Sequence, residues 1–245
     1  FSCRLTDKMR RAMIKRMFFL PLLIFFVLCS GAMAQEADFS EKIRIALWAE
    51  LDAYPSSKEA ANAASTASSP FAYPVSRLKM TAPFLIDGMV YGWSFSFTPS
   101  DKLRNVEERL EITEIGNVSG QNGSSIVYSK PWIADNKVNV WVEFERTPAM
   151  IFTCRMWNTI SAKKAQGRGS GKISDGFEGI TNAAKDALKD ALRAHYRPIL
   201  KNKPKEIRGR VLIRRAPLLG INAGHYTLDL DFFLETDKIT PYTQF

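Results

Sequence analysis

Cysteine and histidine are scarce in this 245-residue chain, which has three of the former and two of the latter. Two of the cysteines, Cys3 and Cys29, lie in an N-terminal segment that we expect to be removed, which leaves Cys154 alone. A single cysteine cannot form an internal disulfide, and with only His195 and His225 beside it no cysteine-rich zinc site can form. We therefore predict no metal, no cofactor and a fold held together by its apolar core.

The N-terminal segment has the organisation of a secretory signal. Basic residues at 10–16 precede a twelve-residue apolar run, FFLPLLIFFVLC, at 18–29. That run is shorter than the roughly 20 apolar residues that a bilayer-spanning helix needs. The small residues Ala32-Met33-Ala34 predict cleavage after Ala34, export to the periplasm or beyond, and no transmembrane segment in the remaining chain.

Two alternatives concern the same segment. An uncleaved signal would anchor the protein in a membrane, which Pro21 and the small residues near the cleavage site disfavour. Lipidation of Cys29 would also tether the chain, although Leu28 stands where a lipoprotein signal has a small residue. The sequence does not begin with methionine, and Met13 opens a well-formed signal, so residues 1–12 are a candidate for a misassigned start.

Net charge gives little support to a nucleic-acid partner. The formal charge is +9, but residues 1–34 hold six basic residues and one acidic residue. The signal therefore carries +5 and leaves a mild excess of +4 on residues 35–245. We expect no nucleic acid to bind this protein.

Composition divides the remaining chain into two parts. Residues 35–70 combine an alternating apolar segment at 43–53, which favours a strand, with an Ala/Ser-rich stretch at 56–69 that predicts a linker. Residues 71–245 are long enough for one sizeable core. We expect a signal at 1–34, a strand and linker at 35–70, and a single α+β domain at 71–245.

Alternating apolar residues predict that strands dominate the domain. We expect strands at 89–98, 138–144, 150–156, 206–215 and 226–234, and a hairpin that pairs 110–118 with 125–133. A short helix is expected from Thr98 to about Glu108. Matching the apolar faces places Phe144 opposite Met150, which turns Cys154 toward the core as an inert thiol.

A basic, glycine-rich stretch at 163–176 lacks the residues of a phosphate-binding loop. Gln166 stands where such a loop needs a glycine, and Ile173 stands where it needs a hydroxyl for the metal. We therefore predict a flexible connector between a strand and a helix.

The clearest helix signal spans residues 176–197. Apolar residues recur there at helical spacing, Asp175 is placed to cap the start, and Pro198 ends the pattern. His195 falls at the centre of the apolar stripe, as a core residue or as a catalytic or ligand-binding group. The predicted fold is α+β, with an antiparallel sheet of about seven to eight strands packed against one long helix of the C-terminal half, about 176–197.

Candidate residues for a hydrolase-like enzyme are two histidines and several acids that face outward from strands: His195, His225, Asp229, Asp231, Glu143 and Glu145. Register matching pairs Val211 with Leu230 and Arg210 with Asp231 on adjacent strands. The Asp-x-Asp motif is therefore interpreted as a salt-bridge partner in preference to an acid–base or metal site.

The most distinctive charge feature is the segment 193–215, with nine basic residues and a single acid. The part of this excess that lies on the helix end and the following loop comprises Arg193, Arg197, Lys201, Lys203 and Lys205. These side chains could bind an anionic polymer, a lipid headgroup or an acidic protein. Trp141 and Trp157 could form a second ligand-binding patch, or could lie under another layer of the fold.

The sequence favours an exported, non-enzymatic protein of the periplasm or cell envelope, a structural or binding module of unknown ligand. Its expected partner is an envelope protein or an anionic surface. The enzyme and the anion-binding module remain the two alternatives.

Overall fold

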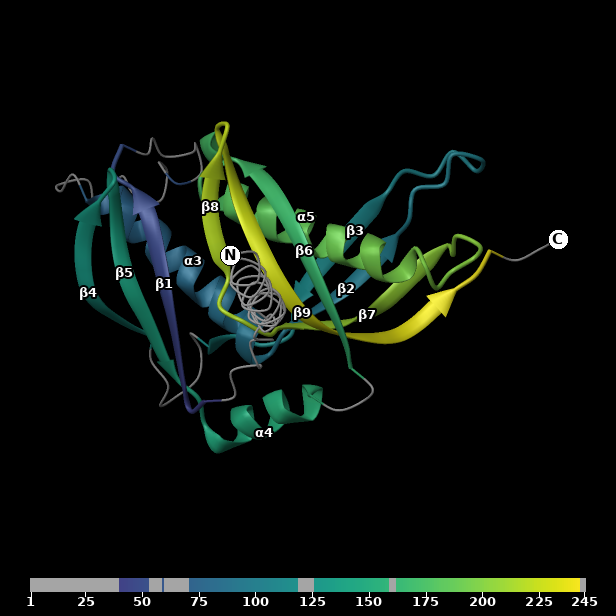
Figure 1. Cartoon of the computed structure of the whole chain (residues 1–245), viewed down its shortest axis with the longest axis horizontal. Coiled ribbons are helices and arrows are strands. Elements are labelled where there is room, and N and C mark those ends of the chain that lie inside the picture. Colours follow the sequence, from purple (N-terminus) through teal and green to yellow (C-terminus); the bar gives the residue numbers. More distant parts are fainter. Residues whose placement is uncertain (1–39, 53–58, 60–70, 119–125, 159–161, 243–245) are drawn as a thin grey trace, which may run out of the picture. The chain divides into compact units, whose positions relative to one another are not determined.

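Nine strands in two antiparallel sheets and three helices make up the part of the chain that the computed structural model describes (Figure 1). The described residues are 40–52, 59, 71–118, 126–158 and 162–242. They belong to one compact unit, Ala37–Phe245. The expected signal at 1–34 and the expected linker at 56–69, apart from Glu59, lie outside the described residues.

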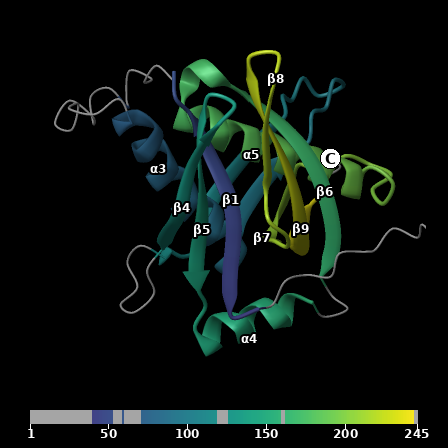
Figure 2. The ribbon, with the colours of Figure 1, turned by 60° about the vertical axis from the view of Figure 1, so that its left-hand side comes forward.

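The smaller sheet has three strands in the order β1 (Lys42–Glu50), β5 (Lys137–Glu145) and β4 (Val127–Ala134), which Figure 2 shows side by side. Its alternation confirms the strands predicted at 43–53 and 138–144. Ile43 lies opposite Phe144 and Ile45 opposite Val142, and all four are buried. This apolar face packs against helix α3 (Ala72–Val90).

The larger sheet runs in the order β3–β2–β7–β9–β6, with β8 also paired to β9. The strands are β2 (Trp93–Thr98), β3 (Arg109–Glu114), β6 (Lys163–Lys172), β7 (Glu206–Ile213), β8 (Leu218–Asn222) and β9 (His225–Thr240). The sixteen-residue β9 pairs with β6 and β8 along its first part and with β7 along its second. It is therefore the strand that joins the two halves of this sheet.

Helix α5 (Phe177–Tyr196) lies on β6 and β9 and confirms the helix predicted at 176–197. Its contact with β6 depends on glycine. A Cβ at Gly169 would collide with the backbone of Ala183 and Ala187, and one at Gly167 or Gly171 would meet the helix backbone in the same way. The glycine-rich stretch is thus a strand that lets a helix approach closely, followed by the short 3₁₀ turn η2 (Ile173–Asp175). The predicted flexible connector at 163–176 is wrong.

The prediction of one long helix is not confirmed, because α3 has nineteen residues against twenty in α5. The strand predicted at 89–98 begins too early, since Met89 and Val90 are the end of α3. Gly92, with φ of 76°, makes the turn into β2. The predicted alternation then holds, with Trp93 and Phe97 buried on the inner face.

Residues 150–156 form a helix where a strand was predicted. Helix α4 (Pro148–Trp157) starts at Thr147, whose side chain accepts the backbone N–H of Met150 at 3.3 Å. Met150 is therefore not paired with Phe144. Cys154 is still buried, because it packs against Leu212 and Phe233.

The hairpin predicted between 110–118 and 125–133 does not form, because β3 pairs with β2 and β4 pairs with β5. The helix expected at 98–108 is replaced by a tight turn. Asp101 and Val106 exchange two backbone hydrogen bonds of 2.9 Å across this turn. The carboxylate of Asp101 also accepts the N–H of Leu103 at 3.0 Å, which fixes the turn.

The register predicted between β7 and β9 is wrong by four residues. Val211 lies opposite Leu234, where Leu230 was expected, and Arg210 faces Glu235 in place of Asp231. A displacement by an even number of residues keeps every side chain on its predicted face, so the apolar pattern could not exclude it.

Candidate functional site

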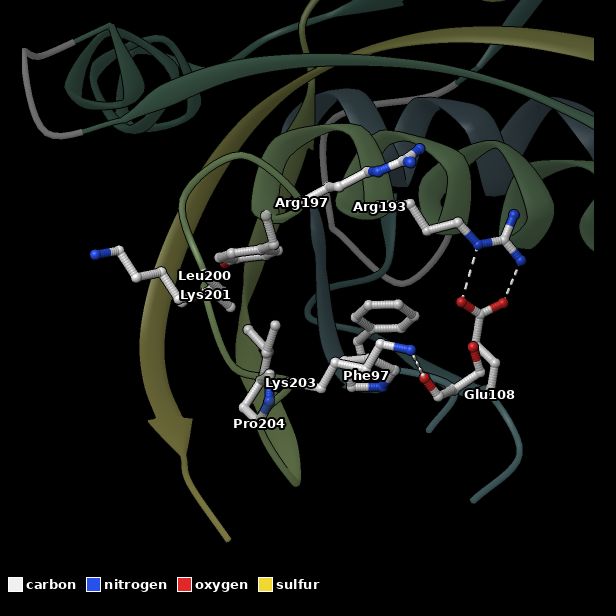
Figure 3. A pocket seen from close by; sticks show the side chains of 12 residues that line it. Phe97, Glu108, Arg193, Arg197, Leu200, Lys201, Lys203 and Pro204 are labelled. Carbon is white, nitrogen blue, oxygen red and sulfur yellow. Dashed lines mark hydrogen bonds and ion pairs between the residues drawn. The ribbon is translucent and has the colours of Figure 1, made fainter. Parts of the chain in front are cut away.

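A groove of about 490 Å³ lies at the C-terminal end of α5, between that helix, the segment after it and β2 (Figure 3). Four of the five predicted basic residues line it, namely Arg193, Arg197, Lys201 and Lys203, which we name the basic rim. The fifth, Lys205, follows directly in the sequence and is exposed. The structure therefore brings most of the predicted anion-binding residues to one place.

The floor of the groove is apolar. Phe97 of β2 lies opposite Ile207 of β7 in the sheet, and both side chains are buried. Tyr196 is also buried and shares a hydrogen bond of 2.6 Å with the hydroxyl of Thr236. Figure 3 shows Leu200 on the same side as Pro204, across from Phe97. The groove thus places apolar surface beside cationic side chains.

The positive charge of the groove is only partly neutralised. Arg193 forms a bidentate ion pair with Glu108, and this interaction raises the pKa of its guanidinium. Lys203 donates to the carbonyl of Ser100 at 2.6 Å. Across the described residues, no ion pair involves Arg197, Lys201 or Lys205, and the Lys201 ammonium points away from the groove (Figure 3). All three of these residues are exposed, so their charges are accessible from solvent.

A second, open hollow of about 1130 Å³ borders the groove. It lies between the turn at residues 100–104, the segment at 200–204 and Tyr242. The guanidinium of Arg104 lies 4.4 Å from the ring centre of Tyr242. Leu103, at the tip of the turn, is 96% exposed.

The histidines lie apart from the predicted acids. His195 is half-buried on α5 with its ring edge-on to Tyr196, and burial together with Lys163 lowers its pKa. His225 is exposed at the start of β9, where Nδ1 lies 3.0 Å from the carbonyl of Ala223. Neither imidazole has a hydrogen bond to a carboxylate among the described residues.

Three of the four predicted acids are engaged with basic side chains along the sheet surfaces, and the fourth, Glu145, is exposed at the end of β5. Asp229 forms a bidentate pair with Arg168, which lies opposite it on β6. Asp231 pairs with Arg215 at 3.0 Å and with Arg214 at 3.5 Å, so the arginine partners differ from the predicted Arg210. Glu143 pairs with Lys42 at 2.7 Å and Arg44 at 3.3 Å. Within the described ranges, no cluster of three His, Cys, Asp or Glu side chains could hold a metal ion.

The two tryptophans proposed as a ligand patch contact different parts of the fold. Trp141 of β5 lies beneath the guanidinium of Arg44, 4.3 Å from the ring centre, and 6.3 Å from the ring of Trp132. Trp157, at the end of α4, packs against the small apolar cluster around Cys154.

One charged cluster gave no recognisable signal in the sequence. Arg77 of α3 is 2% exposed and donates to Glu50 at 3.3 Å, to Glu59 at 2.9 Å and to the hydroxyl of Tyr226 at 3.0 Å. Tyr226 in turn donates to Glu50 at 3.0 Å, and burial raises the pKa of its phenol. The cluster joins α3, β1 and β9, and its members are widely spaced along the chain.

A second buried acid, Asp87, was also not predicted from the sequence. Asp87 of α3 is 3% exposed and accepts the backbone N–H of Val118 at 2.7 Å. Burial raises the pKa of Asp87 to about 6, and the nearby Glu114 acts in the same direction.

Comparison with known proteins places the chain in a family. One protein-family model matches residues 29–242. Over 215 residues the chain is 31% identical to an uncharacterised protein of Treponema pallidum (strain Nichols), which covers 82% of this chain and 82% of that protein. This chain belongs to the same family as that Treponema pallidum protein. No solved structure matches the chain.

Within the described ranges of this protein, no helix combines the length and the apolar composition that a bilayer crossing requires.

Proposed function

We propose that this protein is an exported module of the cell envelope that binds anionic groups at the basic rim and at Lys205. The single observation that carries the proposal is the set of unpaired cations. Arg197, Lys201 and Lys205 have no ion pair across the described residues and lie within one short segment, while the arginines of the strands lie against carboxylates. Export is supported by the signal-like segment at 1–34.

The chemistry of the ligand follows from the side chains. Exposed lysine and arginine at this spacing attract phosphate or carboxylate groups, whether a polymer or a lipid carries them. The attraction is screened by salt, because the cations lie on the surface and face water. Affinity should therefore fall steeply as ionic strength rises.

The test is a double charge reversal, Lys201→Glu with Lys205→Glu, and inorganic polyphosphate as the probe. The side chains of these two lysines form no hydrogen bond or ion pair within the described residues, whereas the Lys203 ammonium donates to the carbonyl of Ser100. The matched control is Lys79→Glu with Lys185→Glu, two exposed lysines on α3 and α5. Isothermal titration at several salt concentrations should show binding by the parent and the control, weakening with salt, and at least tenfold loss in the reversal variant.

Equal affinity of the two double variants, or affinity that does not depend on salt, would contradict the proposal. Export is tested separately by expressing the whole sequence and reading the N-terminus of the purified protein by mass spectrometry. A mature chain that begins at Gln35 is expected.

A further inference from the structure

We propose that the anionic partner is the surface of a lipid bilayer, and that the basic rim docks on it with the side chain of Leu103 inserted. The inference rests on the proposed function and names the class of its ligand. It assigns a role to an apolar side chain that a soluble polyanion would leave unused.

Leu103 is held in solvent by a rigid turn. Its 96% exposure means that it contributes nothing to the core. The turn itself is well fixed. Asp101 and Val106 exchange two backbone hydrogen bonds, and the carboxylate of Asp101 accepts the N–H of Leu103. An apolar side chain at the tip of a fixed turn needs no rearrangement to enter an apolar phase.

Cations surround this leucine. Lys102 and Arg104 flank it in the sequence, and Lys201 and Lys203 border the same hollow. Ile199, in the segment between α5 and β7, is a second exposed apolar residue at 60%. In Figure 1 the β2–β3 turn, this segment and the end of β9 lie at one end of the described fold.

The acids of this end do not cancel the positive charge. Residues 99–110 and 193–208 together hold nine basic and four acidic side chains. Three of these acids are already engaged, Asp101 with Arg104, Glu108 with Arg193 and Glu206 with Arg208, and Glu107 is the fourth. An apolar tip within a ring of net positive charge matches a bilayer that presents anionic headgroups above its acyl chains.

The expected affinity for an anionic bilayer follows from the cations and from the insertion of Leu103. Each lysine or arginine close to an anionic membrane strengthens binding roughly fivefold at moderate salt. Entry of one leucine side chain adds about tenfold or more, depending on its depth.

The experiment measures sedimentation with lipid vesicles. The protein is expressed with its own leader and purified in the form that the cell delivers. Vesicles of phosphatidylcholine mixed with phosphatidylglycerol are compared with vesicles of phosphatidylcholine alone, and inorganic polyphosphate is titrated in parallel. The parent should bind the anionic vesicles and polyphosphate, and should bind the neutral vesicles far more weakly.

The decisive variant is Leu103→Ser. It should lower affinity for anionic vesicles about tenfold and leave polyphosphate affinity unchanged, since the leucine meets only acyl chains. The matched control is Leu218→Ser, because Leu218 is 68% exposed and begins β8, outside the two basic segments 99–110 and 193–208. That control should bind both probes like the parent, and Lys201→Glu with Lys205→Glu should lose affinity for both.

Each contrary outcome has a distinct meaning. Binding to polyphosphate but not to vesicles, or equal vesicle affinity of the two serine variants, overturns the bilayer and leaves the proposed function intact. Equal binding to neutral and anionic vesicles also overturns the inference, because the rim would then play no part. Failure to bind either probe removes both the inference and the proposed function.

Discussion

The carboxylate of Glu59 accepts the backbone N–H of Phe177 at 2.9 Å, although the two residues are 118 positions apart. The start of α5 is therefore capped from a distant segment, whereas the sequence predicted a cap by the adjacent Asp175. Gly176 has φ of 60°, and a Cβ at this position would collide with the Glu59 carboxylate. The same carboxylate binds Arg77, so one acid connects the start of α5 with the second turn of α3.

Replacing Arg77 should destabilise the protein strongly. Arg77→Met removes a buried cation that binds both Glu50 and Glu59, two carboxylates that are themselves largely buried. We expect the free energy of unfolding in urea to fall by about 3–5 kcal/mol. Arg168→Met is the matched control, because Arg168 also pairs with a carboxylate but is mostly exposed. In this variant the free energy of unfolding should fall by less than about 1 kcal/mol. Equal losses in the two variants would show that the buried Arg77 cluster stabilises the fold no more than an exposed ion pair does.

The strands that the sequence predicted correctly are those with side chains on both faces. In β1, β5 and β2, large apolar residues alternate with polar ones, so a period of two is visible. In β6 the inward positions are Gly167, Gly169 and Gly171, and the helix backbone fills the space where side chains would be. A pattern based on apolar side chains has nothing to detect there.

The error in α4 has a different cause. Met150 and Cys154 are four residues apart, a spacing that places two residues on one face of a strand and also on one face of a helix. Thr147-Pro148 could have decided between them, because it combines a capping residue with proline at the first helical position.

Adding one methyl group to β6 should separate the strand from α5. In Gly169→Ala the new Cβ would meet the carbonyl of Ala183 and the amide of Ala187, which are backbone atoms that cannot rotate away. We expect a loss of about 3 kcal/mol in urea unfolding. Gly220→Ala in β8 is the control, since its Cβ would meet only the Thr227 hydroxyl, and it should lose much less. Similar losses would contradict the close approach of strand and helix.

Stability should depend on pH through Asp87. Its pKa is raised from 3.8 to about 6, so the folded protein retains a proton between these values that the unfolded chain releases. Asp87 therefore destabilises the fold as the pH rises through this window, by up to roughly 3 kcal/mol above it. Asp87→Asn keeps an acceptor for Val118, and should raise the free energy of unfolding at about pH 8 but hardly change it at about pH 4.

Asp101→Asn is the control of opposite sign. The hydrogen bond from Arg104 lowers the pKa of Asp101, so the stability that its ionised form contributes is present above the ordinary aspartate pKa and is lost as the pH falls. Asp101→Asn should therefore lower the free energy of unfolding at neutral pH. If Asp87→Asn changed the free energy of unfolding equally at both pH values, the raised pKa of Asp87 would be refuted.

Cys154 should react only after unfolding. Its thiol is buried, with Sγ 3.7 Å from the carbonyl of Met89, and burial raises its pKa. We expect iodoacetamide to leave Cys154 unmodified in the native protein and to alkylate it fully in urea, as measured by peptide mass spectrometry. Rapid alkylation under native conditions would show that α4 opens readily from the sheet.

Much of the candidate site could be predicted because its residues are consecutive. Arg197, Lys201, Lys203 and Lys205 belong to one short segment, so local composition alone indicates a basic surface. Leu103 could not be recognised, because its exposure depends on a turn fixed by Asp101 where a helix was expected. The Arg77 cluster was invisible for a stronger reason, since Arg77 and Tyr226 are 149 positions apart and only the fold unites them.

The position of β9 in the larger sheet also has a consequence for biosynthesis. Among the described strands, β6 and β8 pair with β9 and with no other strand, and both precede it in the chain. While a ribosome is still translating the region before residue 225, these two segments have no hydrogen-bonding partner. Closure of this sheet must therefore wait until the ribosome has released that final partner strand.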